Sequence, residues 1–219
     1  SLDGIGAYHL TLGRNKKSVE LDLKSEEGLK LFKELVLVAD VVVDNFSQGV
    51  TQRLGIDHQS LKKVNPKIIT CSISGFGDTE LNRPAYDNLI QGYAGAMSIT
   101  GTDKENPVKS GIPIADLGAG LYAVIGILSA IQSREKNDSG EHVDISMLDT
   151  QVSLLTYMAT MHFLSGENPE PIGNQHMNHV PFNSYRTSDG FIQIGVVAED
   201  FWPSLIEALN LRKLDTEEN

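Results

Sequence analysis

GIPIADLGAGLYAVIGILSAI, residues 111–131, is the stretch around which this chain is organised. A single carboxylate, Asp116, stands at the head of an otherwise apolar and glycine-rich run. Gly118 and Gly120 follow it directly and indicate close packing against a neighbour. Apolar residues then recur at helical spacing, which predicts a helix beginning near Asp116 (Leu121, Val124, Ile125, Leu128 and Ile131).

Asp116 has two interpretations. As a helix N-cap, it accepts hydrogen bonds from backbone amides that the first turn leaves free. As a functional group, it is the one carboxylate in an apolar setting and therefore the best candidate for chemistry in the chain. Local sequence leaves both interpretations open.

The same stretch approaches the length of a membrane span. It contains Pro113, Asp116 and four glycines, and its uninterrupted apolar part is shorter than a bilayer requires. A core helix is therefore predicted, and no membrane partner. The first ten residues, SLDGIGAYHL, lack the basic and apolar regions of a signal peptide.

The segments before this stretch alternate between strand and helix patterns. Residues 18–23 alternate as in a half-buried strand, and Ser25 caps a helix that follows. Residues 39–46 and 67–77 read as buried parallel strands, with a short helix over 59–65 between them. The predicted fold is α/β, an open Rossmann-like parallel sheet with helices on both faces.

Further patterns complete the predicted organisation. A small-residue helix is expected over 86–100, a strand over 143–148 and a helix over 148–166. The predicted domains are a large α/β domain over 1–165, a proline-containing linker over 166–181, and the start of a smaller α+β domain over 182–219. The last of these opens with a hairpin around Ser188, Asp189 and Gly190.

Charge is distributed unevenly along the 219 residues. The net charge of −11 disfavours nucleic acid and anionic membranes as partners. Residues 1–67 carry ten Lys or Arg against nine Asp or Glu, so the rest of the chain carries eight against twenty. A phosphorylated ligand is therefore expected at the N-terminal third. The lone Cys71 excludes an internal disulfide and fits a reducing compartment, the cytoplasm.

Several common site motifs are absent from the sequence. There is no GxGxxG after a strand, no GxxxxGK[ST] and no GxSxG, so nucleotide and serine-hydrolase signatures do not apply. His176 and His179 stand three apart without an acidic or Cys partner at ligand spacing, which predicts surface histidines and no metal. The other histidines (His9, His58, His142 and His162) are scattered.

Six sequence blocks occur in an order that matches a known family. They resemble the class III coenzyme A transferases, the family of formyl-CoA transferase and carnitine CoA-transferase, from about residue 7 to the end of the chain. The resemblance also implies an internal fragment, because the family's first strand–helix unit and the rest of its small domain have no counterpart here. The blocks are RNKKSVELDLKSEEG (14–28), ADVVVDNFSQGVTQRLG (39–55), NPKIITCSISGFG (65–77), RPAYDNLIQGYAGAMSITG (83–101), GIPIADLGAGLYAVIGILSAI (111–131) and GEHVDISMLD (140–149).

The resemblance implies that Asp116 is the nucleophile. It attacks an acyl-CoA thioester, and an aspartyl anhydride and an aspartyl-CoA thioester follow. A helix N-terminus with free amides is expected to keep this carboxylate ionised. Gly118 and Gly120 are expected to let the thioester approach the backbone, and Tyr86 and Asp87 match a supporting Tyr-acid pair.

The resemblance also implies a binding surface for CoA and an assembly. No permanently bound cofactor is expected, since the CoA thioester is a co-substrate and a carboxylic acid is the acceptor. An interlocked homodimer is implied. The CoA-binding candidates are Arg14, Lys16 and Lys17 for the phosphates, Asn45 and Phe46 for the adenine, and Arg53 for a further phosphate.

Two alternatives remain open at this point. Racemases of the same family move a proton beside the thioester carbonyl and carry a histidine where Tyr86 stands. Tyrosine titrates too high to replace that histidine easily, which favours transfer. The other alternative is a catalytically silent subunit that binds CoA, against which the presence of Asp116 argues.

Overall fold

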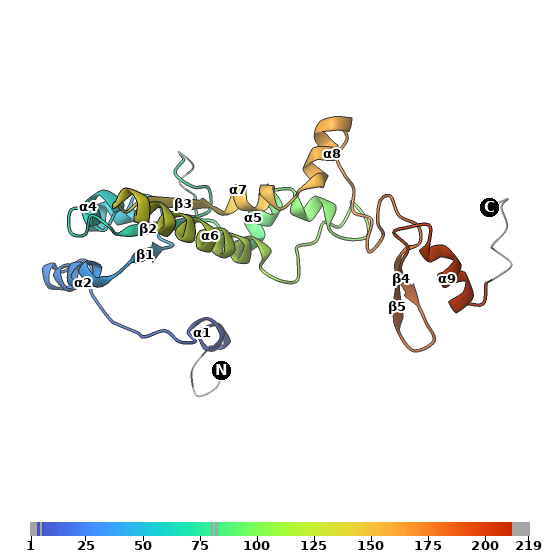
Figure 1. Cartoon of the computed structure of the whole chain (residues 1–219), viewed down its shortest axis with the longest axis horizontal. Coiled ribbons are helices and arrows are strands. Elements are labelled where there is room, and N and C mark those ends of the chain that lie inside the picture. The colour runs from blue at the N-terminus through green and yellow to red at the C-terminus, as the bar shows by residue number, and fades with distance from the viewer. Residues whose placement is uncertain (1–3, 5, 80, 82, 212–219) are drawn as a thin grey trace. The chain divides into compact units, whose positions relative to one another are not determined.

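The structure is a computed structural model that describes residues 4, 6–79, 81 and 83–211. Figure 1 shows the chain coloured from blue at the N-terminus to red at the C-terminus, with elements labelled from α1 to α9. Two compact units are present, one of Ser1–Ser72 with Ile125–Val143 and the other of Ile73–Val124 with Asp144–Asn219. These units are not the domains expected from composition, and the boundaries at 165 and 182 stay a prediction.

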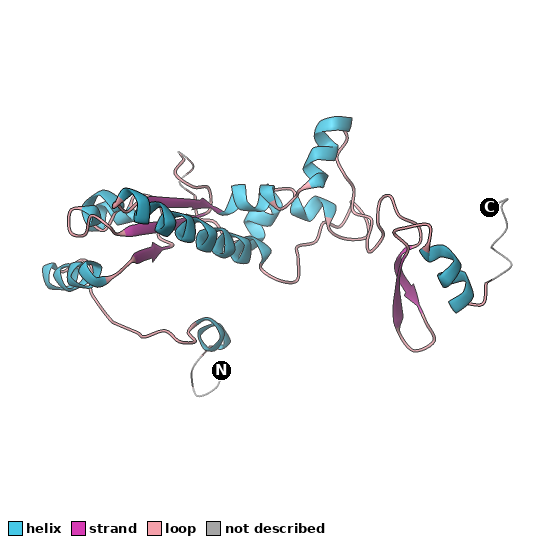
Figure 2. Ribbon diagram, viewed as in Figure 1, coloured by secondary structure: helices cyan, strands magenta, loops and turns pink. Residues whose placement is uncertain are grey.

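The first unit contains a parallel pair of strands with helices. The strands β1 (Val41–Asp44) and β2 (Ile69–Ser74) pair in parallel, and β3 (His142–Ser146) lies on the other side of β2 in the sheet. The magenta arrows in Figure 2 mark these strands. The predicted α/β fold with a parallel sheet is confirmed. The helices of this unit include α1 (Ala7–Leu12), α2 (Glu26–Val38), α3 (Val50–Leu54) and α4 (His58–Lys62).

Helix α2 begins where the sequence predicts. The Ser25 side chain accepts a hydrogen bond from the Gly28 amide at 3.0 Å, and Glu26 and Glu27 occupy the first turn. Both features stabilise the positive end of a helix. The apolar face of α2 then packs into a core in which Val36, Leu61 and Ile68 are almost fully buried.

The predicted strand over residues 18–23 is wrong. In the described part of the chain these residues have no strand partner, and Val19 is 66% exposed. Alternating sequence favours a strand only when a neighbouring strand supplies the ladder of hydrogen bonds and a surface for the apolar side chains. With neither present in this unit, the segment remains irregular.

The second unit has its own core and a hairpin. Ala115 and Ala119 are buried with Phe76, Ile90 and Met147, and a predicted hairpin is confirmed as an antiparallel pair. Figure 2 shows that pair as a two-stranded ribbon. Its elements are α5 (Asp87–Tyr93), η1 (Ala96–Ile99), α7 (Met147–Ser153), α8 (Tyr157–Ser165), β4 (Phe182–Arg186), β5 (Phe191–Gly195) and α9 (Phe201–Ala208).

Two helices predicted as continuous are each divided in two. The predicted helix over 86–100 ends at Tyr93, shortly before Gly95, which has a φ of 80°, and a short 3₁₀ turn follows. The predicted helix over 148–166 is interrupted at Thr156, which has a φ of 50°. A left-handed residue breaks the run of intrahelical hydrogen bonds, and apolar periodicity does not reveal it.

The predicted central helix is confirmed as α6 (Ile114–Asn137), of 24 residues. Its buried face consists of small residues, among them Ala115, Ala119 and Ala123, whereas Leu121 and Ile125 are at least 60% exposed. The helix is long and apolar enough to cross a membrane by length and composition alone, and 28% of its most apolar window is buried. The small face explains how α6 packs closely onto its neighbours.

The C-terminal part of α6 is anchored in the first unit by Arg134. Its guanidinium lies 2.9 Å from a carboxylate oxygen of Asp40 and donates to the backbone oxygen of Lys67 at 3.1 Å. Asp40 directly precedes β1, and Lys67 lies just before β2. The Arg134 side chain is 17% exposed but that of Asp40 is 77% exposed, so the ion pair remains screened by water, and the bond to the Lys67 backbone oxygen adds a second point of attachment.

Candidate active site

Asp116 lies in the first turn of α6. The helix begins at Ile114, so Asp116 is its third residue and is not the N-cap. The residue is exposed, while its neighbour Ala115 is fully buried. The buried alanine fixes the turn in the core, and the carboxylate therefore stands on a rigid base at the surface of this unit.

The capping role predicted for Asp116 belongs to Asp87. One carboxylate oxygen of Asp87 accepts hydrogen bonds from the amides of Ala115 at 2.9 Å and Asp116 at 3.3 Å. Asp87 is in the first turn of α5, so it serves the start of α6 from a different helix. The N-cap interpretation of Asp116 is therefore wrong, because amides of the first turn are already bound by another carboxylate.

Gln91 completes this arrangement, and no motif in the sequence points to it. It is 1% exposed, one turn after Asp87 in α5. Its side-chain amide donates to the second carboxylate oxygen of Asp87 at 2.7 Å, and its oxygen accepts from the Ser110 amide at 2.8 Å. Its one detectable signal is a polar residue four positions after an acid within a helical pattern.

The pKa of Asp116 is raised above its ordinary value. The larger cause is the loss of water around the carboxylate, although the residue as a whole is exposed, and the second cause is the negative charge of Asp87. The sequence-based expectation was the opposite, that free amides and the helix dipole favour the ionised form. The pKa is raised instead because the carboxylate loses water, because Asp87 adds its negative charge, and because Asp87 already occupies those amides.

Tyr86 directly precedes Asp87 and occupies the N-cap position of α5 with an extended backbone. Its side chain is 67% exposed. Asp87 is half-buried and accepts hydrogen bonds from backbone amides. The two members of the predicted pair therefore differ in burial and in hydrogen bonding. Asp87 is placed to support the first turn of α6, and Tyr86 has its ring open to solvent.

The two glycines of the central helix differ in their surroundings. A Cβ at Gly118 would lie 3.0 Å from Leu154 and 3.2 Å from Thr150, at the contact between α6 and α7. A Cβ at Gly120 would meet no atom within 4 Å. Gly118 is therefore explained by close packing. A role in the approach of a ligand remains a prediction, for which Gly120 alone has open space.

We expect Gly118→Val and Gly120→Val to differ in stability, because the two glycines have different surroundings. Overpacking at the α6–α7 contact should lower the free energy of unfolding of Gly118→Val by about 1–3 kcal/mol. Gly120→Val should change it by less than about 0.5 kcal/mol, because a Cβ at this half-buried position meets no atom within 4 Å. Chemical denaturation of both variants measures the difference, and equal stabilities would contradict the packing explanation.

The predicted CoA-binding cations lie in the first unit. Arg14, Lys16 and Lys17 belong to the exposed irregular segment between α1 and α2, and Arg53 is exposed in α3. The ion pairs found in the described part of the chain use other cations (Lys67, Lys104 and Arg134). These four side chains thus remain available to an anion.

The segment after β1 has an ordered start. Ser72 in β2 donates to the Asp44 carboxylate at 2.7 Å, and the same carboxylate accepts from the Phe46 amide at 3.2 Å. The turn that carries Asn45 and Phe46 is therefore fixed at the end of the strand. Phe46 is 44% exposed, so one part of its ring is open to a planar partner.

Two histidines that look scattered in the sequence meet in the first unit. Thr70 is buried in β2, and its hydroxyl lies 3.0 Å from Nδ1 of His58 and 2.8 Å from Nδ1 of His142. Burial and the neighbouring His142 lower the pKa of His58. Among the residues the structure describes, no three His, Cys, Asp or Glu side chains are arranged to hold a metal.

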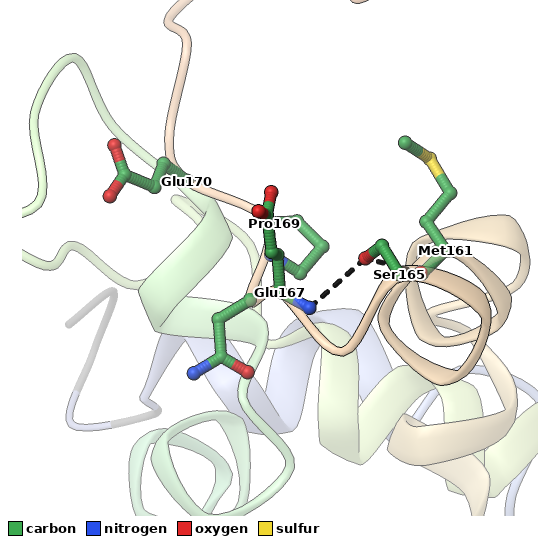
Figure 3. A pocket seen from close by; sticks show the side chains of 6 residues that line it. Met161, Ser165, Glu167, Pro169 and Glu170 are labelled. Carbon is green, nitrogen blue, oxygen red and sulfur yellow. Dashed lines mark hydrogen bonds between the residues drawn. The ribbon is translucent and has the colours of Figure 1, made fainter.

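An open cavity of about 560 Å³ in the second unit lies beside the end of α8 (Figure 3). Ser165 there accepts a hydrogen bond from the Glu167 amide at 3.0 Å, shown as a dashed line. Glu167 and Glu170 give the lining an acidic character, which disfavours the phosphates of CoA. The lining residues are Met161, Ser165, Glu167, Asn168, Pro169 and Glu170, none of them a predicted site residue.

The known proteins that are similar in sequence to this chain include several CoA-transferases. The succinate–glutarate CoA-transferase of Agrobacterium fabrum is 38% identical over 192 residues, covering 87% of this chain and 48% of that protein. The human succinyl-CoA:glutarate CoA-transferase is 32% identical over 209 residues, covering 94% and 48%. The chain thus spans about half the length of these relatives.

A solved structure agrees with the sequence relatives. A CAIB/BAIF family protein from Brucella suis superimposes with a TM-score of 0.83 at 38% identity, covering 93% of this chain and 54% of that one. CoA-transferase family III, as a sequence family, matches residues 1–219. With the match covering the whole chain and the fold agreeing, this chain belongs to CoA-transferase family III.

Proposed function

We propose that the protein transfers coenzyme A from an acyl-CoA donor to a carboxylic acid acceptor, with Asp116 as the covalent nucleophile. The observation that carries the proposal is the pair of carboxylates at the start of α6. Asp87 holds the backbone amides of the first turn, and Asp116 is left exposed without that role. Such an arrangement separates a structural carboxylate from a reactive one.

The proposed reaction consists of four acyl transfers. The Asp116 carboxylate attacks the thioester carbonyl and expels CoA thiolate, which forms a mixed anhydride. The thiolate attacks the aspartyl carbonyl, giving an aspartyl-CoA thioester and releasing the donor acid. The acceptor carboxylate displaces the thiolate to form a second anhydride, and the thiolate then attacks the new acyl group. Asp116 is regenerated and no net proton is consumed.

The raised pKa of Asp116 suits this chemistry. A more basic carboxylate is a stronger nucleophile toward a carbonyl carbon, provided that it is ionised at the working pH. Loss of water from the carboxylate also removes hydration that an attack would otherwise have to displace. Loss of water around the Asp116 carboxylate, together with the nearby charge of Asp87, thus supports its reactivity.

The first unit is proposed to bind the nucleotide end of CoA. The exposed cations Arg14, Lys16, Lys17 and Arg53 suit its phosphates, and the fixed turn with Asn45 and Phe46 suits the adenine ring. CoA is proposed to act as a co-substrate, without a resident cofactor. The full protein is further proposed to be an interlocked homodimer in the cytoplasm, as the family resemblance implies.

The acceptor class is proposed from the relatives. Succinate and glutarate, which their names contain, are dicarboxylic acids. We therefore propose a dicarboxylic acid as the acceptor to examine first, with succinyl-CoA as the donor. Acids of other classes then form the comparison set, since the relatives' names concern those proteins and not this chain.

Trapping of the covalent intermediate tests the proposal. Full-length protein is incubated with succinyl-CoA, treated with hydroxylamine or borohydride, digested and examined by mass spectrometry. A modification on Asp116 that requires the thioester is expected. Steady transfer of CoA to glutarate with no adduct on Asp116, or with an adduct on another side chain, would show that the nucleophile is assigned incorrectly.

A further inference from the structure

The side chain of Gln91 connects two segments of the second unit, helix α5 and the irregular segment before α6. Its Nε2 donates to Asp87 at 2.7 Å, and its Oε1 accepts from the Ser110 amide at 2.8 Å. Ser110 lies in the irregular segment that leads to α6, whereas Gln91 and Asp87 lie in α5. The buried amide therefore joins the start of α5 to the approach of α6.

The orientation of this amide group is determined by its two partners. A flipped amide would place Oε1 against the Asp87 carboxylate and Nε2 against the Ser110 amide. The first contact brings acceptors together and the second brings donors together, so both hydrogen bonds would be lost. Because Gln91 is 1% exposed, water does not replace them cheaply.

The fixed Gln91 in turn fixes Asp87. With one oxygen held by Gln91, the other oxygen of Asp87 faces the amides of Ala115 and Asp116. A continuous chain of hydrogen bonds thus runs from Ser110 to the backbone of Asp116. The direction of the Asp116 side chain depends on that turn of backbone.

We propose that Gln91 is a positioning residue for CoA transfer, which holds Asp87 on the first turn of α6 and so directs the Asp116 carboxylate toward the thioester. This inference rests on the proposed function, in which Asp116 is the nucleophile. Gln91 itself contacts neither substrate nor the reacting atoms. Its effect is on the geometry of attack, and therefore on the rate of acylation and not on the binding of CoA.

The first test variant is Gln91→Leu in the full-length protein. It removes both hydrogen bonds and replaces the amide group with an apolar side chain of roughly similar size. Adduct formation on Asp116 should slow by tenfold to about a hundredfold, as small misplacements of a reacting group do, while the KM for succinyl-CoA changes less than about twofold. A folded Gln91→Leu variant that forms the adduct at the parental rate would overturn the proposal.

Gln91→Glu provides a second variant in case Gln91→Leu does not fold. When protonated, the introduced carboxyl group can donate to Asp87 and accept from the Ser110 amide. When ionised, it repels Asp87, and Asp116 is the other acid close to this chain of contacts. The rate of adduct formation relative to the parent should therefore fall as pH rises. A ratio that does not vary with pH would contradict the positioning role.

Gln151→Leu serves as the matched control. Gln151 is also buried, in α7, and its side-chain oxygen has no hydrogen-bond partner among the described residues. Its variant should acylate within about twofold of the parent. The parent protein reports on the proposed function itself: if no adduct forms on its Asp116, the nucleophile is wrong, whereas an adduct unaffected by Gln91 substitution overturns the positioning role alone.

Discussion

Asp116→Ala in the full-length protein should reduce CoA transfer by about a thousandfold or more, because loss of a covalent nucleophile removes the whole reaction path. The KM for succinyl-CoA should change little, since the proposed CoA contacts lie in the first unit. Transfer between succinyl-CoA and glutarate, followed by mass detection of both CoA esters, measures the effect. A variant that retains a tenth of parental activity would exclude the covalent role.

Asp57→Ala is the control that distinguishes the loss of a helix N-cap from the loss of the proposed nucleophile. Asp57 is a true N-cap, whose side chain accepts from the Ser60 amide at 3.2 Å. Its removal should lower the free energy of unfolding by about 0.5–2 kcal/mol and leave transfer unchanged. Asp116→Ala should show the reverse pattern. A folded-state pKa above the unfolded value means that the ionised Asp116 lowers stability at higher pH, so its removal should not destabilise the protein.

The fold was predictable where the evidence is local. Ser25 before an amphipathic run located the start of α2, and the β-branched residues of β1 located a strand. The expected burial of that strand is wrong, because β1 lies at the edge of the described sheet and Val43 is 54% exposed. The strand expected at residues 18–23 required a partner, which no local pattern contains. The break at Thr156 depended on one backbone angle of 50°, and apolar spacing continues through it without change.

The candidate site was predictable in part. The family blocks singled out Asp116 and Asp87. Which of the two binds the backbone amides of the helix start is decided by a contact between residues 29 positions apart. A sequence shows that an acid precedes a helix and does not show which distant acid binds its amides. Gln91 was missed for the same reason, because its burial and its two partners arise only after α5 packs beside the start of α6.

Asp87→Asn should shift the acid limb of kcat/KM for transfer to lower pH. Transfer requires the ionised Asp116, so the rate rises as pH passes through the pKa of that carboxyl group. The charge of Asp87 contributes to raising that pKa, and a neutral amide removes the contribution. The same change makes Asp116 less basic and disturbs the Gln91 contact, so the plateau rate should fall on the order of tenfold.

The comparison with Asp87→Ala shows why both variants are needed. An asparagine oxygen can still accept from the amides of Ala115 and Asp116, whereas alanine leaves them without that partner. Asp87→Ala should therefore also lower the free energy of unfolding by about 1 kcal/mol, which Asp87→Asn should largely avoid. If the acid limb of Asp87→Asn coincides with that of the parent, the charge of Asp87 does not control Asp116. The capping contact would then be its whole contribution, and the raised pKa would have to come from the loss of water alone.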